Sequence, residues 1–178
     1  MSKVYMARHG LTAWNLQNKI CGTTDLELTE EGIRQARILG EKVAGLKVDL
    51  IVTSAMKRAR QTGGIIGEMN GIPVISDARL AEVNFGKYEG VDRQDAGYQR
   101  DKLDFACRYP NGGESTFLAA HRLFSCLDDL KEKYPGKNLL IVGHGSACRI
   151  MRTYFEDVKN EEFYNFRLDN CEIAEYKW

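Results

Sequence analysis

The sequence lacks an excess of charge of either sign, and it lacks long apolar runs. Its 25 basic residues balance 25 acidic ones, so the formal net charge is zero with neutral histidines. No overall field therefore favours nucleic acid or an anionic membrane surface, and we predict neither as a partner. The start, Met1 to Tyr5, leads directly into a strand-like pattern without an apolar stretch of signal-peptide or membrane-spanning length. These absences predict a soluble cytoplasmic protein.

Paired cysteine motifs are also missing. The five cysteines are odd in number, widely scattered and free of any Cys-x-x-Cys spacing: Cys21, Cys107, Cys126, Cys148 and Cys171. This distribution argues against a disulfide framework and against a zinc knuckle. We expect most of the five to be small buried hydrophobic residues.

Strand-like and helix-like segments alternate along most of the chain. Strands are expected at 4–7, 50–53, 72–75 and 139–142, with an edge strand at 171–176. Helices are expected from Thr29 to Gly45, from Ser54 to Met69, from Ser115 to about 133 and from about 146 to 155. This alternation predicts an α/β fold, a three-layer α/β/α sandwich with a mostly parallel central sheet.

The length of 178 residues suits one buried core and is short for two, so we predict a single domain over 1–178. The apolar pattern weakens between Leu80 and Gly113, where Gly, Asp, Tyr and Arg are frequent. We interpret about 84–113 as a small cap-like insertion, of which one or two aromatic or basic side chains contact the substrate. A long loop at 11–25 is expected to fold over a site.

Two of only three histidines follow strand-like stretches and precede glycine. His9 ends the run Tyr5-Met6-Ala7-Arg8-His9-Gly10, and His144 ends Leu140-Ile141-Val142-Gly143-His144-Gly145. Open α/β sheets place their binding crevice at the carboxyl ends of strands, so one site built from both ends of the chain is expected. The alternative is that each imidazole is a polar residue satisfied within a turn.

Arginines accompany these histidines. Arg8 precedes His9, and Arg58 lies early in the helix after the second strand. Guanidinium groups match phosphoryl oxygens, so two of them beside two imidazoles predict an anion pocket. Metal ligation is the competing use of paired histidines, but it normally lacks cations against the ion, and we predict no metal.

If the bound anion is a phosphoryl group, the histidines and arginines can take part in phosphoryl transfer. A neutral His9 can attack phosphorus and carry the group as a phosphohistidine, and the leaving alcohol then needs a proton. Glu82 is the best candidate acid, because it follows an extended stretch and lies among apolar neighbours. A single glutamate in a loop is otherwise usually a solvated surface charge.

Several motifs resemble the histidine phosphatase superfamily, which includes the cofactor-dependent phosphoglycerate mutases. Its Arg-His-Gly-x-Thr-x-x-Asn signature is met by Arg8-His9-Gly10-Leu11-Thr12-Ala13-Trp14-Asn15, and Ser-x-x-x-Arg-Ala-x-Gln-Thr is met around Arg58. The segment from Glu82 to Gly90 is similar to the family's acid-bearing loop, Gly113-Glu114-Ser115 to a later segment, and Val142-Gly143-His144-Gly145 to the second-histidine motif. The resemblance spans nearly the whole chain in the right order.

The resemblance implies a phosphoglycerate mutase-like fold and a role for each matched residue. His9 would be the phosphorylated nucleophile and Glu82 the proton donor, while Arg8, Arg58 and His144 would neutralise the phosphoryl oxygens. The remaining phosphate-pocket residues would be Thr12, Asn15, Cys21, Gly22 and Gly145. No cofactor is expected, the partner is a small phosphorylated substrate, and the C-terminal edge strand could pair in a homodimer.

Departures from the family pattern bear on the reaction. Leu11 stands where the family often has Glu, and Thr24 stands where its phosphatases frequently have Gln. The stretch between Gly90 and Gly113 is shorter than the insertion associated with the mutases, which favours hydrolysis over mutase activity. We therefore expect a metal-independent phosphomonoesterase that hydrolyses a small phosphorylated metabolite through a phosphohistidine intermediate. The alternatives are a phosphoglycerate mutase and a phosphate-binding protein without catalysis.

Overall fold

The computed structural model describes residues 2–178 and contains one five-stranded sheet of order β3-β2-β4-β1-β5. The strands are β1 (Lys3–Arg8), β2 (Leu50–Ser54), β3 (Val74–Asp77), β4 (Leu139–Gly143) and β5 (Ile173–Lys177). The α-helices are α1 (Ala13–Leu16), α2 (Glu30–Ala44), α3 (Lys57–Asn70), α4 (Ala96–Asp101), α5 (Thr116–Lys133), α6 (Gly145–Arg152) and α7 (Asn160–Asn165). Two 3₁₀ helices, η1 (Ala78–Leu80) and η2 (Gly86–Tyr88), separate β3 from α4.

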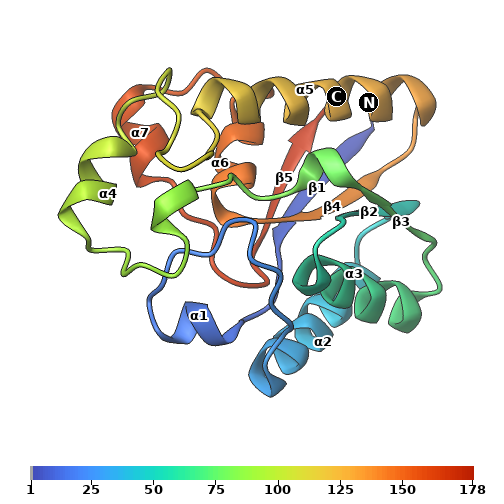
Figure 1. Cartoon of the computed structure of the whole chain (residues 1–178). Helices are drawn as coiled ribbons and strands as arrows, with labels where there is room; N and C mark the ends of the chain where they lie inside the picture. Colours follow the sequence, from blue (N-terminus) through green and yellow to red (C-terminus); the bar gives the residue numbers. More distant parts are fainter. Residues whose placement is uncertain (1) are drawn as a thin grey trace.

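Helices cover both faces of the sheet. In Figure 1, α5 and α6 lie on one side of the strands and α2 and α3 on the other, and the two chain ends lie close together beside α5. Residues of β1 alternate accordingly: Val4 and Met6 belong to the core cluster under α5 and α6, whereas Tyr5 and Ala7 belong to the cluster under α2 and α3. The predicted three-layer α/β/α arrangement is confirmed.

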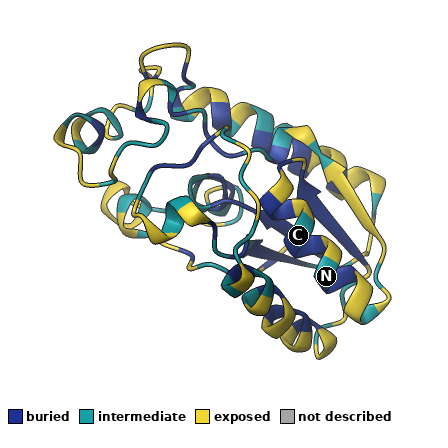
Figure 2. Cartoon of the chain, turned by 60° about the horizontal axis from the view of Figure 1, so that its bottom comes forward, coloured by how far each residue is buried: buried dark blue, intermediate teal, exposed yellow. Residues whose placement is uncertain are grey.

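The sheet is parallel except at one edge. β1 pairs in parallel with β4, β4 with β2 and β2 with β3, whereas β5 runs antiparallel to β1. The edge strand predicted at 171–176 is therefore confirmed as β5, although its pairing with another subunit stays a prediction. Figure 2 shows the consequence of the layering, with buried residues concentrated in the strands and exposed ones on the outer faces of the helices.

Two of the predicted helix starts are confirmed and one is wrong. The Thr29 hydroxyl accepts the N–H of Gly32, and the Ser115 hydroxyl accepts that of Leu118. Ser54, however, stays in β2 opposite Asp77, so α3 begins only at Lys57. The backbone N–H of Lys57 donates instead to the Asp25 carboxylate at 2.7 Å, which fastens the 11–25 loop to α3.

The segment predicted as a cap packs against the main core. Four aromatic side chains from it, Phe85, Tyr88, Tyr98 and Tyr109, are buried in the cluster that includes α5 and α6. Two short helices that the sequence pattern did not indicate, α4 within this segment and α7 after α6, lie at the same end of the molecule (Figure 1). The single-domain boundaries themselves stay a prediction.

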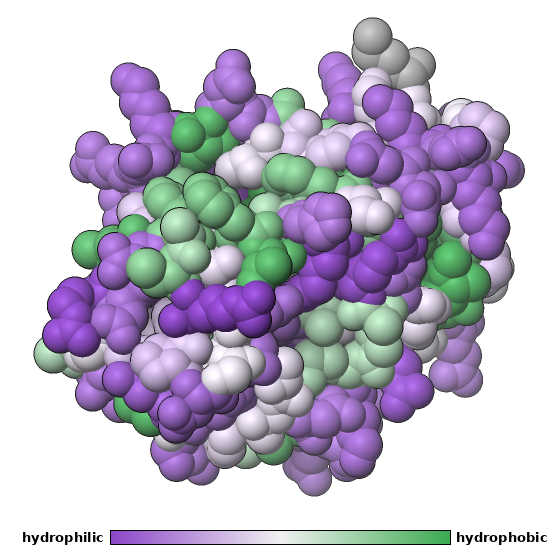
Figure 3. All heavy atoms as spheres, turned by 45° about the horizontal axis from the view of Figure 1, so that its top comes forward, coloured by the Kyte–Doolittle hydropathy of each residue, from purple (hydrophilic) through white to green (hydrophobic). Residues whose placement is uncertain are grey.

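The outer surface carries hydrophilic and apolar side chains side by side. On the face shown in Figure 3, apolar side chains gather left of the centre, and hydrophilic ones lie along the margin and across the middle of the view. The exposed apolar residues include Phe117 and Leu118 at the start of α5. Within residues 2–178, no helix combines the length and apolarity needed to cross a bilayer.

Candidate active site

Two parallel strands bring the histidines together. β1 ends at Arg8 and β4 at Gly143, which are paired in register, so His9 and His144 follow neighbouring strand ends. Their ring centroids lie 5.2 Å apart with an interplanar angle of 60°. Both imidazoles are buried, and the site expected from the two ends of the chain is present as one cluster.

Hydrogen bonds define the tautomer of His9. Its Nδ1 lies 2.7 Å from the carbonyl oxygen of Gly10, which can only accept, so Nδ1 carries the proton. The other ring nitrogen, Nε2, accepts from Nε of Arg58 at 3.2 Å. Burial, followed by the charges of Arg58 and Arg8, lowers the pKa of His9 well below its usual value. His9 is therefore neutral at pH 7, with the lone pair of Nε2 directed at the arginine.

Arg58 links both histidines to the 11–25 loop. Its Nε also donates to Nδ1 of His144 at 3.1 Å, and its two terminal nitrogens donate to the carbonyl oxygens of Thr24 and Gly22. The side chain is fully buried in α3. Because His144 accepts at Nδ1, its proton lies on Nε2, and burial together with Arg58 lowers its pKa well below the usual value.

Two buried N–H groups in this cluster have no acceptor among the described residues. They are Nε of Arg8 and Nε2 of His144. An unpaired buried donor is costly, so the pair suits an anion with several acceptor oxygens. Gly145 leaves room for such a group, since a Cβ at that position would lie 3.8 Å from Arg8 Nε and 3.9 Å from Glu82 Oε2.

Glu82 lies at the N-terminus of α6, in a more polar setting than its sequence neighbours indicated. Its Oε1 accepts from the backbone N–H groups of Val83 and Ala147, and its Oε2 accepts from Ser146. Only 5% of the residue is exposed. Arg122 of α5 holds the preceding turn by donating to the carbonyl oxygens of Arg79, Ala81 and Glu82. The carboxyl group is thus fixed beside the space next to Gly145.

The other predicted phosphate-pocket residues mainly organise the loop. Thr12 donates through its backbone N–H and its hydroxyl to Oδ1 of Asn15, which turns the amide so that Nδ2 is its remaining donor. The N–H of Gly22 is taken by Glu89 and its carbonyl by Arg58, while the Cys21 thiol contacts the carbonyl of Thr24. In this structure Cys21 and Gly22 therefore affect the pocket indirectly, because they fix the conformation of the 11–25 loop and the position of the Arg58 side chain.

A comparison with protein families decides the family. The family model described as histidine phosphatase superfamily (branch 1) matches residues 4–178. The chain belongs to the histidine phosphatase superfamily. The fold and motif resemblance seen in the sequence are thereby confirmed.

Relatives of this histidine phosphatase carry two kinds of name. It is 37% identical to the uncharacterized phosphatase PhoE of Bacillus subtilis, over 100% of this chain and 92% of that protein. It is 33% identical to a Klebsiella pneumoniae protein named "Probable phosphoglycerate mutase GpmB", over 98% of this chain and 84% of that one. Among solved structures, a mycobacterial glucosyl-3-phosphoglycerate phosphatase in complex with VO3 superposes with a TM-score of 0.88 at 25% identity, over 98% and 90% of the two chains. The relatives support an enzyme that acts on phosphate compounds.

Three residues of the histidine phosphatase site were missed in the sequence. Glu89 accepts the backbone N–H groups of Gly22, Thr23 and Thr24, and so shapes the loop that Arg58 grips. Asn170 donates to the carbonyl oxygen of His9 at 2.8 Å. The guanidinium of Arg93 lies close enough to contribute to the lowered pKa of both Arg8 and His9. Only Glu89 lay in a quoted motif, and nothing local marks Asn170 or Arg93.

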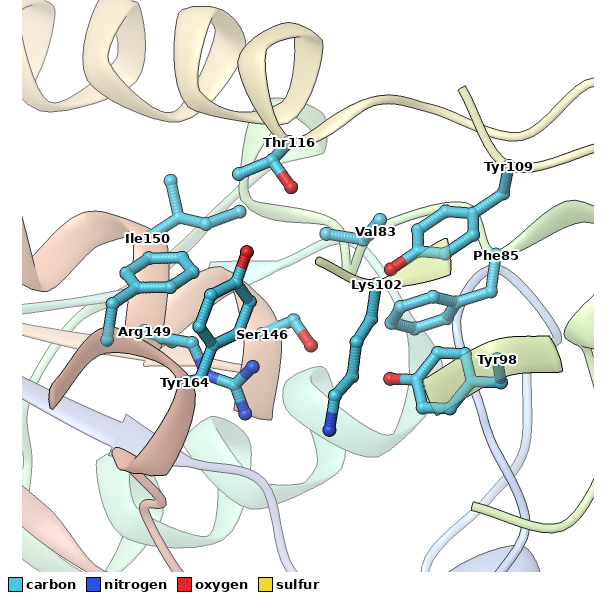
Figure 4. Close-up of a pocket in the computed structure, with 11 residues that line it drawn as sticks. Val83, Phe85, Tyr98, Lys102, Tyr109, Thr116, Ser146, Arg149, Ile150 and Tyr164 are labelled. Carbon is cyan, nitrogen blue, oxygen red and sulfur yellow. The ribbon is translucent and has the colours of Figure 1, made fainter. Parts of the chain in front are cut away.

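A narrow cavity adjoins this site on the side of Glu82. Figure 4 shows aromatic side chains around it, with polar groups from α4, α6 and α7 turned toward its interior. The lining residues are Val83, Phe85, Tyr98, Lys102, Tyr109, Thr116, Ser146, Arg149, Ile150, Phe163 and Tyr164. Tyr98 and Tyr109 of the 84–113 segment line this cavity, whereas Arg100 pairs with Asp101, and contact of this segment with a substrate stays a prediction.

Proposed function

We propose that this histidine phosphatase is a metal-independent phosphomonoesterase that hydrolyses a small phosphorylated metabolite through a phosphohistidine on His9. The observation that carries the proposal is the neutral imidazole of His9, whose Nε2 lone pair is held only by the N–H of Arg58 and lies beside two buried donors that lack an acceptor among the described residues. A neutral ring nitrogen is a nucleophile, and the surrounding cations favour the negative charge of a phosphoryl group.

In the first step a phosphoryl oxygen takes the N–H of Arg58 that now contacts His9, and others accept from Arg8 and His144. Nε2 of His9 then attacks phosphorus, and the bond from phosphorus to the leaving oxygen breaks. Glu82 gives that oxygen its proton, which releases an alcohol. The arginines and His144 neutralise charge on the transferring group without any step that needs a metal.

In the second step a water molecule attacks the phosphohistidine. Glu82, now a carboxylate, takes the proton from this water, and the bond from Nε2 to phosphorus breaks. Inorganic phosphate leaves, and His9 and Glu82 return to their starting protonation states. The two steps together consume one phosphomonoester and one water molecule.

The second candidate is a phosphoglycerate mutase, which the 33% identical relative named as such favours. A mutase would keep water out and retain a bisphosphate intermediate long enough for it to reorient before one phosphoryl group returns to His9. The short stretch between Gly90 and Gly113 and the phosphatase-named relative at 37% identity support hydrolysis instead.

Phosphate release in the presence of a chelator tests the proposal. We expect the wild type to hydrolyse p-nitrophenyl phosphate with EDTA present, to be inhibited by vanadate, and to yield an acid-labile, alkali-stable phosphoryl group when quenched during turnover. His9→Ala should lose all three properties while retaining its circular dichroism spectrum. His121→Ala, at the exposed third histidine on α5, is the matched control and should behave as the wild type.

The same assay separates the candidates. Isomerisation of phosphoglycerate that depends on a bisphosphoglycerate primer, without net phosphate release, would establish the mutase and overturn the phosphatase proposal. Activity that disappears with EDTA and returns with a divalent metal would overturn the metal-independent mechanism. Phosphate binding without any turnover would favour the third alternative, a protein that binds phosphate only.

A further inference from the structure

The cavity beside Glu82 lies where a leaving group must go. Ser146 lines this cavity, and its backbone N–H donates to Oε2 of Glu82 at 3.0 Å. The proton donor of the proposed function therefore lies between the histidine cluster and the cavity. An alcohol that receives its proton from Glu82 has its carbon skeleton on this side.

Two cations in the cavity have no carboxylate partner. Lys102 and Arg149 form no ion pair with any of residues 2–178. Nε of Arg149 donates to the carbonyl oxygen of Phe166 at 3.3 Å, and Nζ of Lys102 donates to the amide oxygen of Gln99. Both contacts are to neutral acceptors, so neither cation has a carboxylate in direct contact.

Burial and mutual repulsion act on both cations. Burial lowers the pKa of Arg149, and the nearby charge of Arg167 lowers it further. Burial likewise lowers the pKa of Lys102, followed by the charges of Arg149 and Arg167. Tyr98 and then Glu82 act in the opposite direction and raise the pKa of Arg149. Half-buried cations that repel one another are stabilised by an anion brought in by a ligand.

The walls of the cavity are aromatic. The ring of Phe85 lies 5.8 Å from that of Tyr98 in an edge arrangement, and Tyr98 stacks on Tyr109 at 6.2 Å. Phe163 and Tyr164 line the cavity from α7. Such surfaces favour a flat apolar group over a flexible polyhydroxylated one. The open volume is about 20 Å³, room for about one water molecule, so lining side chains, among them the flexible Lys102, must move for a ring to enter.

We propose that this cavity binds the leaving group of the substrate, and that Arg149 and Lys102 bind a carboxylate that this group carries. The inference rests on the proposed phosphatase function and gives its substrate class. The substrate is a phosphomonoester of a planar, aromatic hydroxy acid. The guanidinium of Arg149 provides a planar fork for the carboxylate, and Lys102 adds a second, movable charge.

A matched pair of aryl phosphates tests this assignment. 4-Carboxyphenyl phosphate and its methyl ester differ by one charge, and the ester is the intrinsically better leaving group. We expect the wild type to prefer the acid by at least about tenfold in kcat/KM at low salt, and to lose much of this preference as the ionic strength rises. Because the ester is the more reactive compound, a preference for the acid must come from binding by the protein and not from leaving-group reactivity.

Variants assign the preference to the two cations. Arg149→Met should reduce the acid-to-ester ratio to near one, Lys102→Met should reduce it several-fold, and Arg149→Lys should restore part of it. Arg152→Met is the matched control, because Arg152 is also on α6 but pairs with Glu156, and its ratio should equal that of the wild type. If the Arg149→Met protein does not fold, the acid-to-ester ratio of Lys102→Met and the salt dependence of the wild-type ratio test the carboxylate site.

Two outcomes separate this assignment from the proposed function. Hydrolysis of both esters with a ratio near one, or a wild-type ratio in both the Arg149→Met and Lys102→Met proteins, overturns the carboxylate site and leaves the phosphatase intact. Absence of hydrolysis of either ester, and of p-nitrophenyl phosphate, overturns the phosphatase and the carboxylate site together.

Discussion

The two ends of the site are built differently. At the phosphate end, defined by Arg8, His9, Arg58, Glu82 and His144, the side chains are held by backbone carbonyl and N–H groups at strand and helix ends. At the leaving-group end, defined by the cavity lining, the cations contact only neutral acceptors and the aromatic rings come from short helices and turns. Under the proposed function, the first arrangement would hold the phosphoryl group in one geometry, and the second would determine which leaving group binds.

The largest expected effect within this comparison is at Glu82. Glu82→Gln removes the proposed proton donor, so kcat for an alkyl phosphate should fall by about 10²- to 10⁴-fold. The loss should be much smaller for p-nitrophenyl phosphate, whose leaving group departs as a stable anion. The measurement is kcat for glycerol phosphate and p-nitrophenyl phosphate side by side. Equal losses on both substrates would show that Glu82 does not protonate the leaving oxygen, and Glu68→Gln, on the exposed face of α3, is the control.

A smaller effect is expected at Glu89, which acts on the phosphate end through the loop. Glu89→Gln disturbs the three N–H groups that its carboxylate accepts, so Arg58 loses its fixed carbonyl partners at Gly22 and Thr24. We expect kcat/KM to fall by roughly 10- to 100-fold for every substrate alike, because misplacement affects the common phosphoryl group. Glu27→Gln, which breaks only an exposed pair with Lys57, should leave kcat/KM unchanged. A loss that differs between substrates would place Glu89 at the leaving-group end.

The next largest expected effect is the loss of stability at low pH that comes from the two buried histidines, His9 and His144. Burial holds the pKa of His9 and of His144 well below 6.5, so below pH 6.5 the unfolded chain binds protons that the folded protein does not. Stability from this source is complete above about pH 6.5 and is lost as the pH falls, by at most about 1.4 kcal/mol per pH unit for each histidine. Urea unfolding at a series of pH values in phosphate-free buffer gives the free energy of unfolding as a function of pH. Below pH 6.5 this free energy should fall less steeply with falling pH for His9→Gln than for the wild type. His121→Gln should keep the wild-type slope, and an unchanged slope in His9→Gln would refute the assignment.

The smallest effect is expected from a hydroxyl at the leaving-group end. Tyr109→Phe keeps the aromatic wall and removes one polar atom for which the described residues supply no hydrogen-bond partner. We expect kcat/KM for small aryl phosphates to change by less than about threefold, since a stacked ring contributes mainly through its area. Steady-state kinetics over a panel of aryl phosphates measures this. A uniform loss as large as that of Glu89→Gln would mean that the two ends are not separable.

The same contrast explains what could be predicted from the sequence. His9, His144 and Arg58 follow strand ends or begin a helix, so short motifs and the parallel-sheet rule were enough to bring them together. Asn170 and Glu89 act across 161 and 67 residues of sequence, and no local pattern encodes such contacts. The six-residue helices α4 and α7 are too short to show a period.

The error at Ser54 has a similar cause. Its hydroxyl suits a helix cap, but the residue continues the ladder between β2 and β3. Pairing with Asp77 therefore took precedence over the local capping preference, and an aspartate from a distant loop supplied the acceptor at the start of α3. Local propensity is a weak guide wherever a tertiary partner is available.

The position of β1 between β4 and β5 bears on how the chain is made. β1 is translated early, yet both of its neighbours in the sheet are translated late, β4 from Leu139 and β5 from Ile173. At about 5 to 20 residues per second, a ribosome needs roughly 7 to 33 seconds to reach them. During that interval the apolar strand before His9 is without partners, which makes the nascent chain a candidate for chaperone binding.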